Sequence, residues 1–191
     1  MLCDMFRKSK KPVISPNIDL YHGTNVKFRR PKPNVNELPC DLGKGFYLTE
    51  DWDRAVSRAD EKAKSNENSE KWVLKFVFDD EKAYRDAKRG KLWLKEYNPD
   101  KEWLDVVSSF WDPSLTNLLN HSQIEGIIIS PSSDARIPTV LKEYRTSPRT
   151  VKDVETALSG LELEKYGIQY FFGSKAVIRK YLTFAGAYRI R

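Results

Sequence analysis

Three prolines within residues 29–45, RRPKPNVNELPCDLGKG, limit the fold of this chain more than any other feature. Proline lacks the backbone N–H that a helix interior and a central strand both need, so this stretch forms neither. It is predicted to be a long exposed loop, and loops of this length in compact domains often carry function. The loop separates two short segments, residues 18–24 and 45–50, that both have the pattern of strands.

The remaining sequence alternates irregularly between predicted helices and strands. Residues 49–65 have an acidic start and apolar side chains at helical spacing, which predicts an amphipathic helix. Further strands are expected at residues 71–80, 91–97, 126–131, 167–174 and 186–191, and further helices at residues 100–110, 150–161 and 174–182. Asp100 and Ser174 are the expected helix caps. Because several strands follow one another directly, the pattern favours an α+β fold over a doubly wound parallel sheet.

Length and composition indicate one compact domain over residues 17–191, preceded by a loose basic arm at residues 1–16. The chain lacks an apolar run that could span a bilayer and a recognisable signal peptide, so a cytoplasmic protein is expected, with delivery into another cell left open. The two cysteines, Cys3 and Cys40, lack the spacing of a zinc site. A reducing compartment and a protein without a metal are therefore expected.

The chain carries 33 Lys and Arg residues against 27 Asp and Glu residues, a formal net charge of +6. Such an excess favours encounter with polyanions, either nucleic acid or nucleotide phosphates. A soluble surface with scattered charge explains the same numbers. A third interpretation is a nucleic-acid-binding protein, but the sequence contains no recognised nucleic-acid-binding motif to support it.

Two motifs carry a resemblance to a known family. LYHGT at residues 20–24, followed by GKGFYLTEDWDRAVSRA at residues 43–59, resembles the first two motifs of the ADP-ribosyltransferase superfamily, in its poly(ADP-ribose) polymerase and diphtheria-toxin-like branch. Together with IIISPSSDAR and IQYFFGSKAVIRKYL further along, these motifs are similar to an uncharacterised bacterial family of that fold. The resemblance extends over residues 18–183.

The resemblance implies split antiparallel sheets with flanking helices around a cleft that holds NAD as a substrate. It implies a mono-ADP-ribosyltransferase that transfers ADP-ribose to a protein or nucleic acid and releases nicotinamide. A bacterial toxin or effector with an inhibitory antitoxin, an NAD glycohydrolase, and a catalytically silent module that binds NAD or ADP-ribose all remain open.

The first motif and Tyr47 are expected to hold the nicotinamide nucleoside. By the resemblance, Tyr47 offers an aromatic ring for stacking, and Gly23 lets the main chain approach the nicotinamide. His22 is expected to bind the hydroxyls of the adenosine ribose, and Thr24 to support either the turn or the nicotinamide amide. A histidine after a strand and a tyrosine on a strand also have ordinary structural roles, and only the joint arrangement of the motifs favours the ligand roles.

Residues of the glycine-rich segment are expected near the phosphates. Gly43 and Gly45 would clear room beside the pyrophosphate, and Lys44 would meet a phosphate unless it is simply solvated. In polymerase-like members a second stacking aromatic lies on the following helix, where this chain has Arg58. Arg58 could supply a planar cation or a phosphate contact instead. This departure argues against chain elongation and favours a single transfer.

The third motif departs from the well-known members, which have a glutamate where this chain has Gln169. A glutamine can hydrogen-bond the nicotinamide ribose, but it brings no negative charge to the transition state. The resemblance thus implies His22, Tyr47 and Gln169 as the catalytic set. Glu162 and Glu164 are either alternatives for the missing acid or residues of a solvated turn.

Three other positions are candidates for a functional role. Asp134 and Arg136 fall where the related family has a polar motif, so they indicate either target recognition or simple turn chemistry. Cys40 could be a reactive thiol, although Lys44 is the nearest basic residue.

Overall fold

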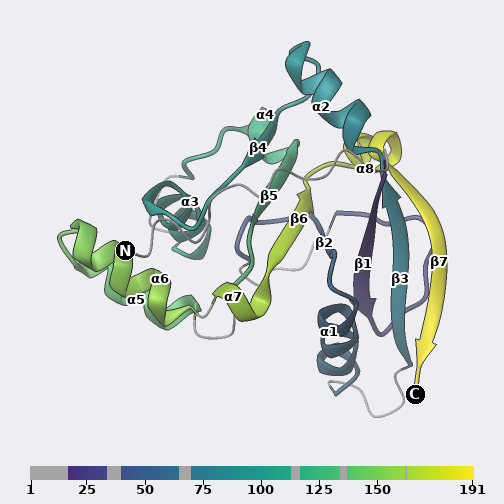
Figure 1. Ribbon diagram of the computed structural model, residues 1–191, viewed down its shortest axis with the longest axis horizontal. Coiled ribbons are helices and arrows are strands. Elements are labelled where there is room, and N and C mark those ends of the chain that lie inside the picture. Colours follow the sequence, from purple (N-terminus) through teal and green to yellow (C-terminus); the bar gives the residue numbers. More distant parts are fainter. Residues whose placement is uncertain (1–16, 34–39, 65–69, 113–116, 134–136, 162) are drawn as a thin grey trace.

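The computed structural model describes residues 17–33, 40–64, 70–112, 117–133, 137–161 and 163–191. These residues form an α+β fold around one seven-stranded mixed sheet of order β4-β5-β6-β2-β1-β3-β7 (Figure 1). The strands are β1 (Ile18–Thr24), β2 (Phe46–Thr49), β3 (Lys71–Phe78), β4 (Leu94–Glu96), β5 (Ile127–Pro131), β6 (Ile168–Phe172) and β7 (Leu182–Ile190). The helices are α1 (Trp52–Lys64), α2 (Asp80–Lys88), α3 (Lys101–Trp111), α4 (His121–Ile124), α5 (Ile137–Thr146), α6 (Val151–Gly160), α7 (Leu163–Tyr166) and α8 (Lys175–Tyr181).

The predicted α+β class is confirmed, and the predicted caps are confirmed in atomic detail. The Asp100 side chain accepts a hydrogen bond from Trp103 N at the start of α3, and Ser174 does the same for Val177 N at the start of α8. Helix α2 was not predicted from the sequence, although its cap Asp79 follows β3 directly and accepts from Lys82 N. Helices α4, α5 and α7 were not predicted either, and the arm expected at residues 1–16 lies outside the described residues.

Strands β5 and β6 are buried on both faces. In β5, Ile128 packs with Phe171 of β6 in a core that includes Trp103 and other residues of α3, α5 and α6. The neighbouring Ile127 and Ile129 point to the opposite core, which β1 and β3 also line. A strand between two cores has no polar side, so its sequence is a continuous apolar run rather than an alternating pattern.

The sheet has its weakest connection between β1 and β2. These strands are joined in register by one residue pair, Tyr21 and Thr49. Strand β1 pairs with β3 along its whole length, from Ile18 opposite Phe78 to Thr24 opposite Trp72. The two separate antiparallel sheets implied by the resemblance are therefore joined into one sheet, and β4 pairs with β5 in parallel.

Helix α1 lies directly against β1 because Gly23 has no side chain. A Cβ atom at Gly23 would lie 1.9 Å from the carbonyl oxygen of Ala55. Ala55 and Ala59 are the buried residues of α1, and their small size permits the same close approach. This contact fixes the helix beside the point where β1 and β2 separate.

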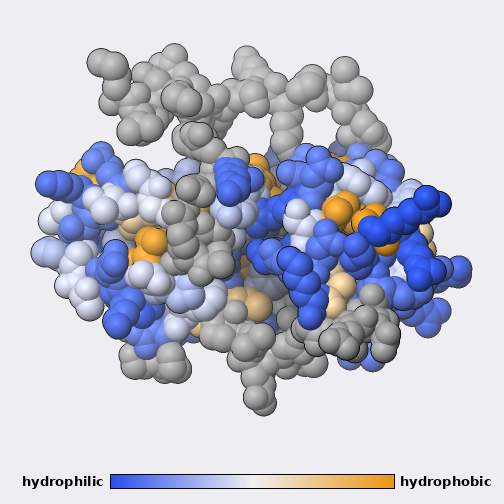
Figure 2. Space-filling view, turned by 90° about the horizontal axis from the view of Figure 1, so that it is seen from below, coloured by the Kyte–Doolittle hydropathy of each residue, from blue (hydrophilic) through white to orange (hydrophobic). Residues whose placement is uncertain are grey.

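The face of the molecule shown in Figure 2 is largely polar. In the view of Figure 2, hydrophilic side chains predominate and hydrophobic ones are exposed in small separate patches. None of the described helices has both the length and the apolar character needed to cross a membrane.

Candidate functional site

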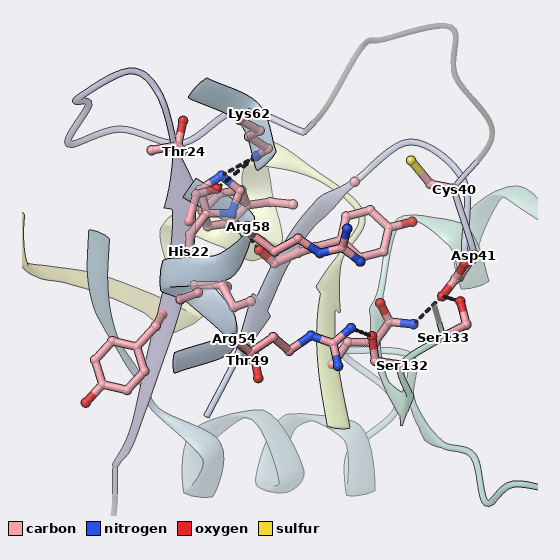
Figure 3. Close-up of a pocket in the computed structure, with 18 of the residues that line it drawn as sticks. His22, Thr24, Cys40, Asp41, Thr49, Arg54, Arg58, Lys62, Ser132 and Ser133 are labelled. Atoms are coloured by element: carbon pink, nitrogen blue, oxygen red, sulfur yellow. Dashed lines mark hydrogen bonds between the residues drawn. The ribbon is translucent and has the colours of Figure 1, made fainter. Parts of the chain in front are cut away.

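A cavity of about 620 Å³ opens where β1 and β2 diverge. Its lining comes from the end of β1, from β2, from α1, from the residues after β5 and from the start of β6 (Figure 3). Of the residues expected to be catalytic or to bind NAD, those that line the cavity are His22, Gly23, Thr24, Gly45, Tyr47, Arg58 and Gln169. Gly43 and Lys44 are outside this lining.

His22 is held across the β1–β2 junction in a defined tautomer. Its Nδ1 lies 2.8 Å from the carbonyl oxygen of Tyr47, which can only accept, so Nδ1 carries the proton. Its Nε2 is then an acceptor for the Lys62 ammonium at 3.4 Å. Burial, and secondarily the charge of Lys62, lowers the pKa of His22 to about 3. His22 is therefore a neutral side chain at physiological pH.

Tyr47 supports the loop that precedes it. Its hydroxyl donates to the carbonyl oxygen of Gly43 at 2.7 Å and accepts from Leu42 N at 3.2 Å. Its ring meets Phe171 edge-on, with the ring centroids 5.2 Å apart. Burial raises the pKa of Tyr47 well above its usual value, so the hydroxyl keeps its proton as a donor. The side chain thus connects the cavity to the core.

Gln169 holds a carboxylate in the cavity. Its Nε2 donates to Asp41 Oδ2 at 3.1 Å and to the carbonyl oxygen of Pro131 at 3.0 Å. The Ser133 hydroxyl donates to the same Asp41 oxygen at 2.6 Å. Asp41, which the sequence analysis did not select, therefore lies at the position of the third motif. Its partners are far away in the sequence, so no local pattern could have identified it.

Three cations of α1 border the cavity at a spacing of four residues. They are Arg54, Arg58 and Lys62, of which only Arg58 was selected from the sequence. Arg54 extends across the cleft, where its Nη2 donates to the Ser132 hydroxyl (Figure 3). Lys62 donates to the carbonyl oxygen of Gly23 at 3.0 Å. Following the helical period from Arg58 in both directions would have found the other two.

The selected glycines have structural reasons for lacking a side chain. Gly23 makes room for α1, as described above. A Cβ at Gly45 would lie 2.0 Å from the Phe171 ring, and one at Gly43 would lie 2.8 Å from the Phe110 ring. Gly43 also has a positive φ of 78°. Thr24 supports its turn through Oγ1, which accepts from Val26 N at 3.2 Å.

The other selected positions add little to this site. Cys40 borders the cavity, where burial and the nearby Asp41 raise the pKa of its thiol, which disfavours the reactive thiolate. Glu162, Asp134 and Arg136 lie outside the described residues, and the side chain of Glu164 is not described either. Within the described ranges, no three His, Cys, Asp or Glu residues gather as a metal-binding group.

A family model described as "Protein of unknown function (DUF3990)" matches residues 18–184 of the chain. The match begins with β1 and ends within β7, so it includes every strand and helix that borders the cavity. No curated protein and no solved structure matches the chain.

Proposed function

We propose that this chain, which belongs to the DUF3990 family of proteins of unknown function, is an NAD-dependent mono-ADP-ribosyltransferase. One observation carries the proposal: His22, Tyr47 and Gln169, from three separate segments, line a single cavity. These are the residues that the motif resemblance selects for such a transfer. The cavity volume of about 620 Å³ is in the range of small-molecule sites.

In this proposal the sheet has two halves with the NAD cleft between them. Strands β4, β5, β6 and β2 form one half, and β1, β3 and β7 form the other. Because Tyr21 and Thr49 are the one backbone register pair between β1 and β2, the ends of these two strands are available to border a ligand. This arrangement would supply the split sheet that the resemblance implies.

The substrate brings an ADP-ribose group bound to nicotinamide, which is a good leaving group because it departs neutral. The glycosidic C–N bond breaks with its electron pair going to nicotinamide. A new bond forms between the anomeric carbon and an acceptor nucleophile, which loses its proton. The chain has to bind the two parts of the dinucleotide, orient the ribose and stabilise the positive charge that develops on it.

Asp41 supplies the negative charge that Gln169 lacks. The carboxylate is fixed by the Ser133 hydroxyl and the Gln169 amide, so it needs no reorganisation during the reaction. At an effective dielectric constant of about 20, a carboxylate about 4 Å from a developing cation contributes up to about 4 kcal/mol. Gln169 is then a positioning residue as well as a hydrogen-bonding partner for the ribose.

His22 and Tyr47 have roles suited to their observed protonation. The neutral His22 presents Nε2 as an acceptor for a ribose hydroxyl, a contact now made by Lys62. The Tyr47 ring offers apolar surface for nicotinamide, while its hydroxyl keeps the Asp41–Gly43 segment in place. The donor set also fits a dinucleotide, because buried Arg54 Nη1 has no hydrogen-bond partner within the described part of the chain.

A silent binding module is the second candidate. It is favoured by Gln169, whose amide group is already engaged by Asp41 and Pro131 rather than presented freely to a ribose. Such a module would bind NAD or ADP-ribose in the same cavity without releasing nicotinamide.

Incubation with NAD labelled in its adenosine part, together with total cell lysate, tests the proposal. We expect free nicotinamide and label attached to macromolecules, and digestion with protease or nuclease identifies the acceptor class. Nicotinamide release without a labelled macromolecule would indicate an NAD glycohydrolase. NAD binding without nicotinamide release would contradict the enzyme and support the silent module.

A further inference from the structure

The cationic face of α1, formed by Arg54, Arg58 and Lys62, borders the cavity and has no role yet in the proposed reaction. Arg54, Arg58 and Lys62 follow one another at intervals of four residues, so they project from the same side of the helix. Successive members are separated by one helical turn, about 6 Å along the axis. All three border the cavity (Figure 3).

The Arg54 guanidinium lies over the Tyr166 ring, and one of its nitrogens has no hydrogen-bond partner among the described residues. Its Nη2 donates to the Ser132 hydroxyl, whereas its Nη1 is buried and meets no acceptor in the described ranges. Buried donors almost always have a partner, so an exception at a cavity wall indicates a missing acceptor. Because a guanidinium offers planar paired donors, the acceptor that suits it best is a carboxylate or a phosphate.

The positive charges of Arg54 and Arg58 are only partly neutralised by acidic groups among the described residues. Arg58 forms an ion pair with Glu61 at 2.7 Å, but both side chains are about half exposed and such pairs contribute little. Asp41 interacts electrostatically with Arg54, and its carboxylate also accepts hydrogen bonds from Ser133 and Gln169. Burial, and next the charge of Arg58, lowers the pKa of Arg54 to about 10 and also lowers that of Lys62. An anion between these side chains would relieve this repulsion.

We infer that the Arg54–Arg58–Lys62 face is the site for the diphosphate of a nucleotide ligand. The inference rests on the proposed function and deepens it, because it places the phosphates at α1 rather than at Gly43, Lys44 and Gly45. Two neighbouring cations, one helical turn apart, can each contact a different phosphate group. The face lines a cavity instead of a convex surface, so it suits a small nucleoside diphosphate better than a nucleic-acid backbone.

Calorimetric titration of the full chain with ADP, and with adenosine for comparison, tests the site without any NAD cleavage. The variants are Arg54→Gln, Arg54→Lys and Arg58→Gln. Arg85→Gln on the exposed face of α2 is the matched control. We expect wild-type protein to bind ADP more tightly than adenosine. Each glutamine variant should weaken ADP binding about 10-fold or more, since hydrogen bonds to charged groups are the strong ones.

Adenosine binding should change less than about 2-fold in every variant, and Arg85→Gln should bind ADP like wild type. Arg54→Lys keeps the charge and the fold, and it should retain part of the ADP affinity. Equal ADP affinity in Arg58→Gln and wild type would overturn the site. Wild-type protein that binds ADP no more tightly than adenosine would also overturn the site. If Arg58→Gln lost binding to duplex DNA but kept its ADP affinity, the ligand of this face would be nucleic acid and the diphosphate site would be wrong.

The two proposals can fail separately. If ADP binding depends on Arg54 and Arg58 but wild type releases no nicotinamide from NAD, the diphosphate site stands and the transferase does not. If wild type releases nicotinamide and labels a macromolecule, and Arg58→Gln does so with an unchanged KM for NAD, the transferase stands and the diphosphate site is wrong.

Discussion

The chemistry of His22 depends on its neighbours more than that of any other cleft residue. The Tyr47 carbonyl fixes the proton on Nδ1, and the Lys62 ammonium opposes a second proton on Nε2. A histidine in a sequence suggests a group that titrates near neutral pH, but this one is kept neutral by its enclosure. It can accept a hydrogen bond from a ligand, and it cannot act as an acid.

Because of this shift, His22 should make the stability of the protein depend on pH. The pKa in the folded protein is about 3, below the ordinary value of 6.5 in the unfolded chain. Between these values the unfolded state binds the extra proton, so the contribution of His22 is complete above pH 6.5 and is lost as the pH falls towards 3. At about 1.4 kcal/mol per pH unit, wild type should lose roughly 3 kcal/mol more than His22→Gln between pH 6.5 and 4.

Urea unfolding followed by circular dichroism at several pH values measures this difference. Comparison of wild type with His22→Gln also controls for the carboxylates that titrate in the same pH range, because both proteins contain all of them. Parallel stability curves for the two proteins would contradict the buried neutral imidazole.

Asp41 is the second residue on which the mechanism depends. Asp41→Asn removes the charge but keeps an oxygen that can accept from Ser133 and Gln169. We expect nicotinamide release to fall about 10- to 1,000-fold, because the carboxylate acts mainly on the charge of the transition state. The KM for NAD should change little, which steady-state kinetics can measure.

The matched control is Asp53→Asn, which removes an exposed acid from the first turn of α1. It should retain wild-type turnover. Unchanged turnover in Asp41→Asn would exclude a catalytic role for Asp41. Gln169 would then be the one residue of the third motif left to act on the ribose.

At the scale of elements, the contact between α1 and β1 positions the cationic face. Gly23 brings the helix backbone against the strand, and the buried Ala55 and Ala59 provide the other side of this contact. The helical period then places Arg54, Arg58 and Lys62 at the cavity. A glycine that looks like part of a ligand-binding turn thus has a packing role that holds whether or not a ligand is bound.

Gly23→Ala should therefore destabilise the protein and weaken ADP binding together. The new methyl group would lie 1.9 Å from the Ala55 carbonyl oxygen and 2.7 Å from Ala59 N, so the helix has to move. Overpacking of this kind costs about 1–3 kcal/mol in the free energy of unfolding. Chemical denaturation gives the stability and calorimetry gives the ADP affinity.

Gly90→Ala is a useful comparison for this variant. No atom lies within 4 Å of a Cβ at Gly90, so its cost is limited to the strain of a positive φ of 68°. That variant should keep its ADP affinity. A Gly23→Ala protein with wild-type stability and ADP affinity would show that α1 is not fixed by this contact.

At the scale of the whole molecule, the two halves of the sheet meet at one residue pair. Strand β1 is firmly paired with β3, and β2 is firmly paired with β6, but β1 and β2 share one backbone register pair, Tyr21 and Thr49, and the His22–Tyr47 hydrogen bond. The cavity lies at this junction and takes residues from both halves. A ligand that contacts both sides would add connections that the backbone does not provide.

Hydrogen exchange should detect this effect of a ligand. We expect added NAD or ADP to slow amide exchange in β2 and α1, which belong to different sides of the cavity. Exchange in β7, at the far edge of the sheet, should stay unchanged. Mass spectrometry of peptides from these segments makes the measurement. Slowing confined to β7, or uniform over the chain, would contradict a ligand at the junction.

The sequence by itself determined the elements whose signals are local. The α+β class, the strand at residues 18–24, the caps Asp100 and Ser174, and the buried strand before Pro131 are all confirmed. Each depends on periodicity or on hydrogen bonds within one turn, which neighbouring residues specify. The helix α2 was missed although Asp79 is such a cap, because its signal directly follows that of β3.

Tertiary structure alone decided which side chains share the cavity. Gln169 meets Asp41, which is 128 positions away in the sequence, and Arg54 meets Ser132, which is 78 positions away. Contacts of this length arise from the pairing of β2 with β6 and of β5 with β6, and no local pattern encodes them. For the same reason the carboxylate beside Gln169 could not be predicted: Asp41 is an ordinary loop residue until the sheet brings the third motif to it.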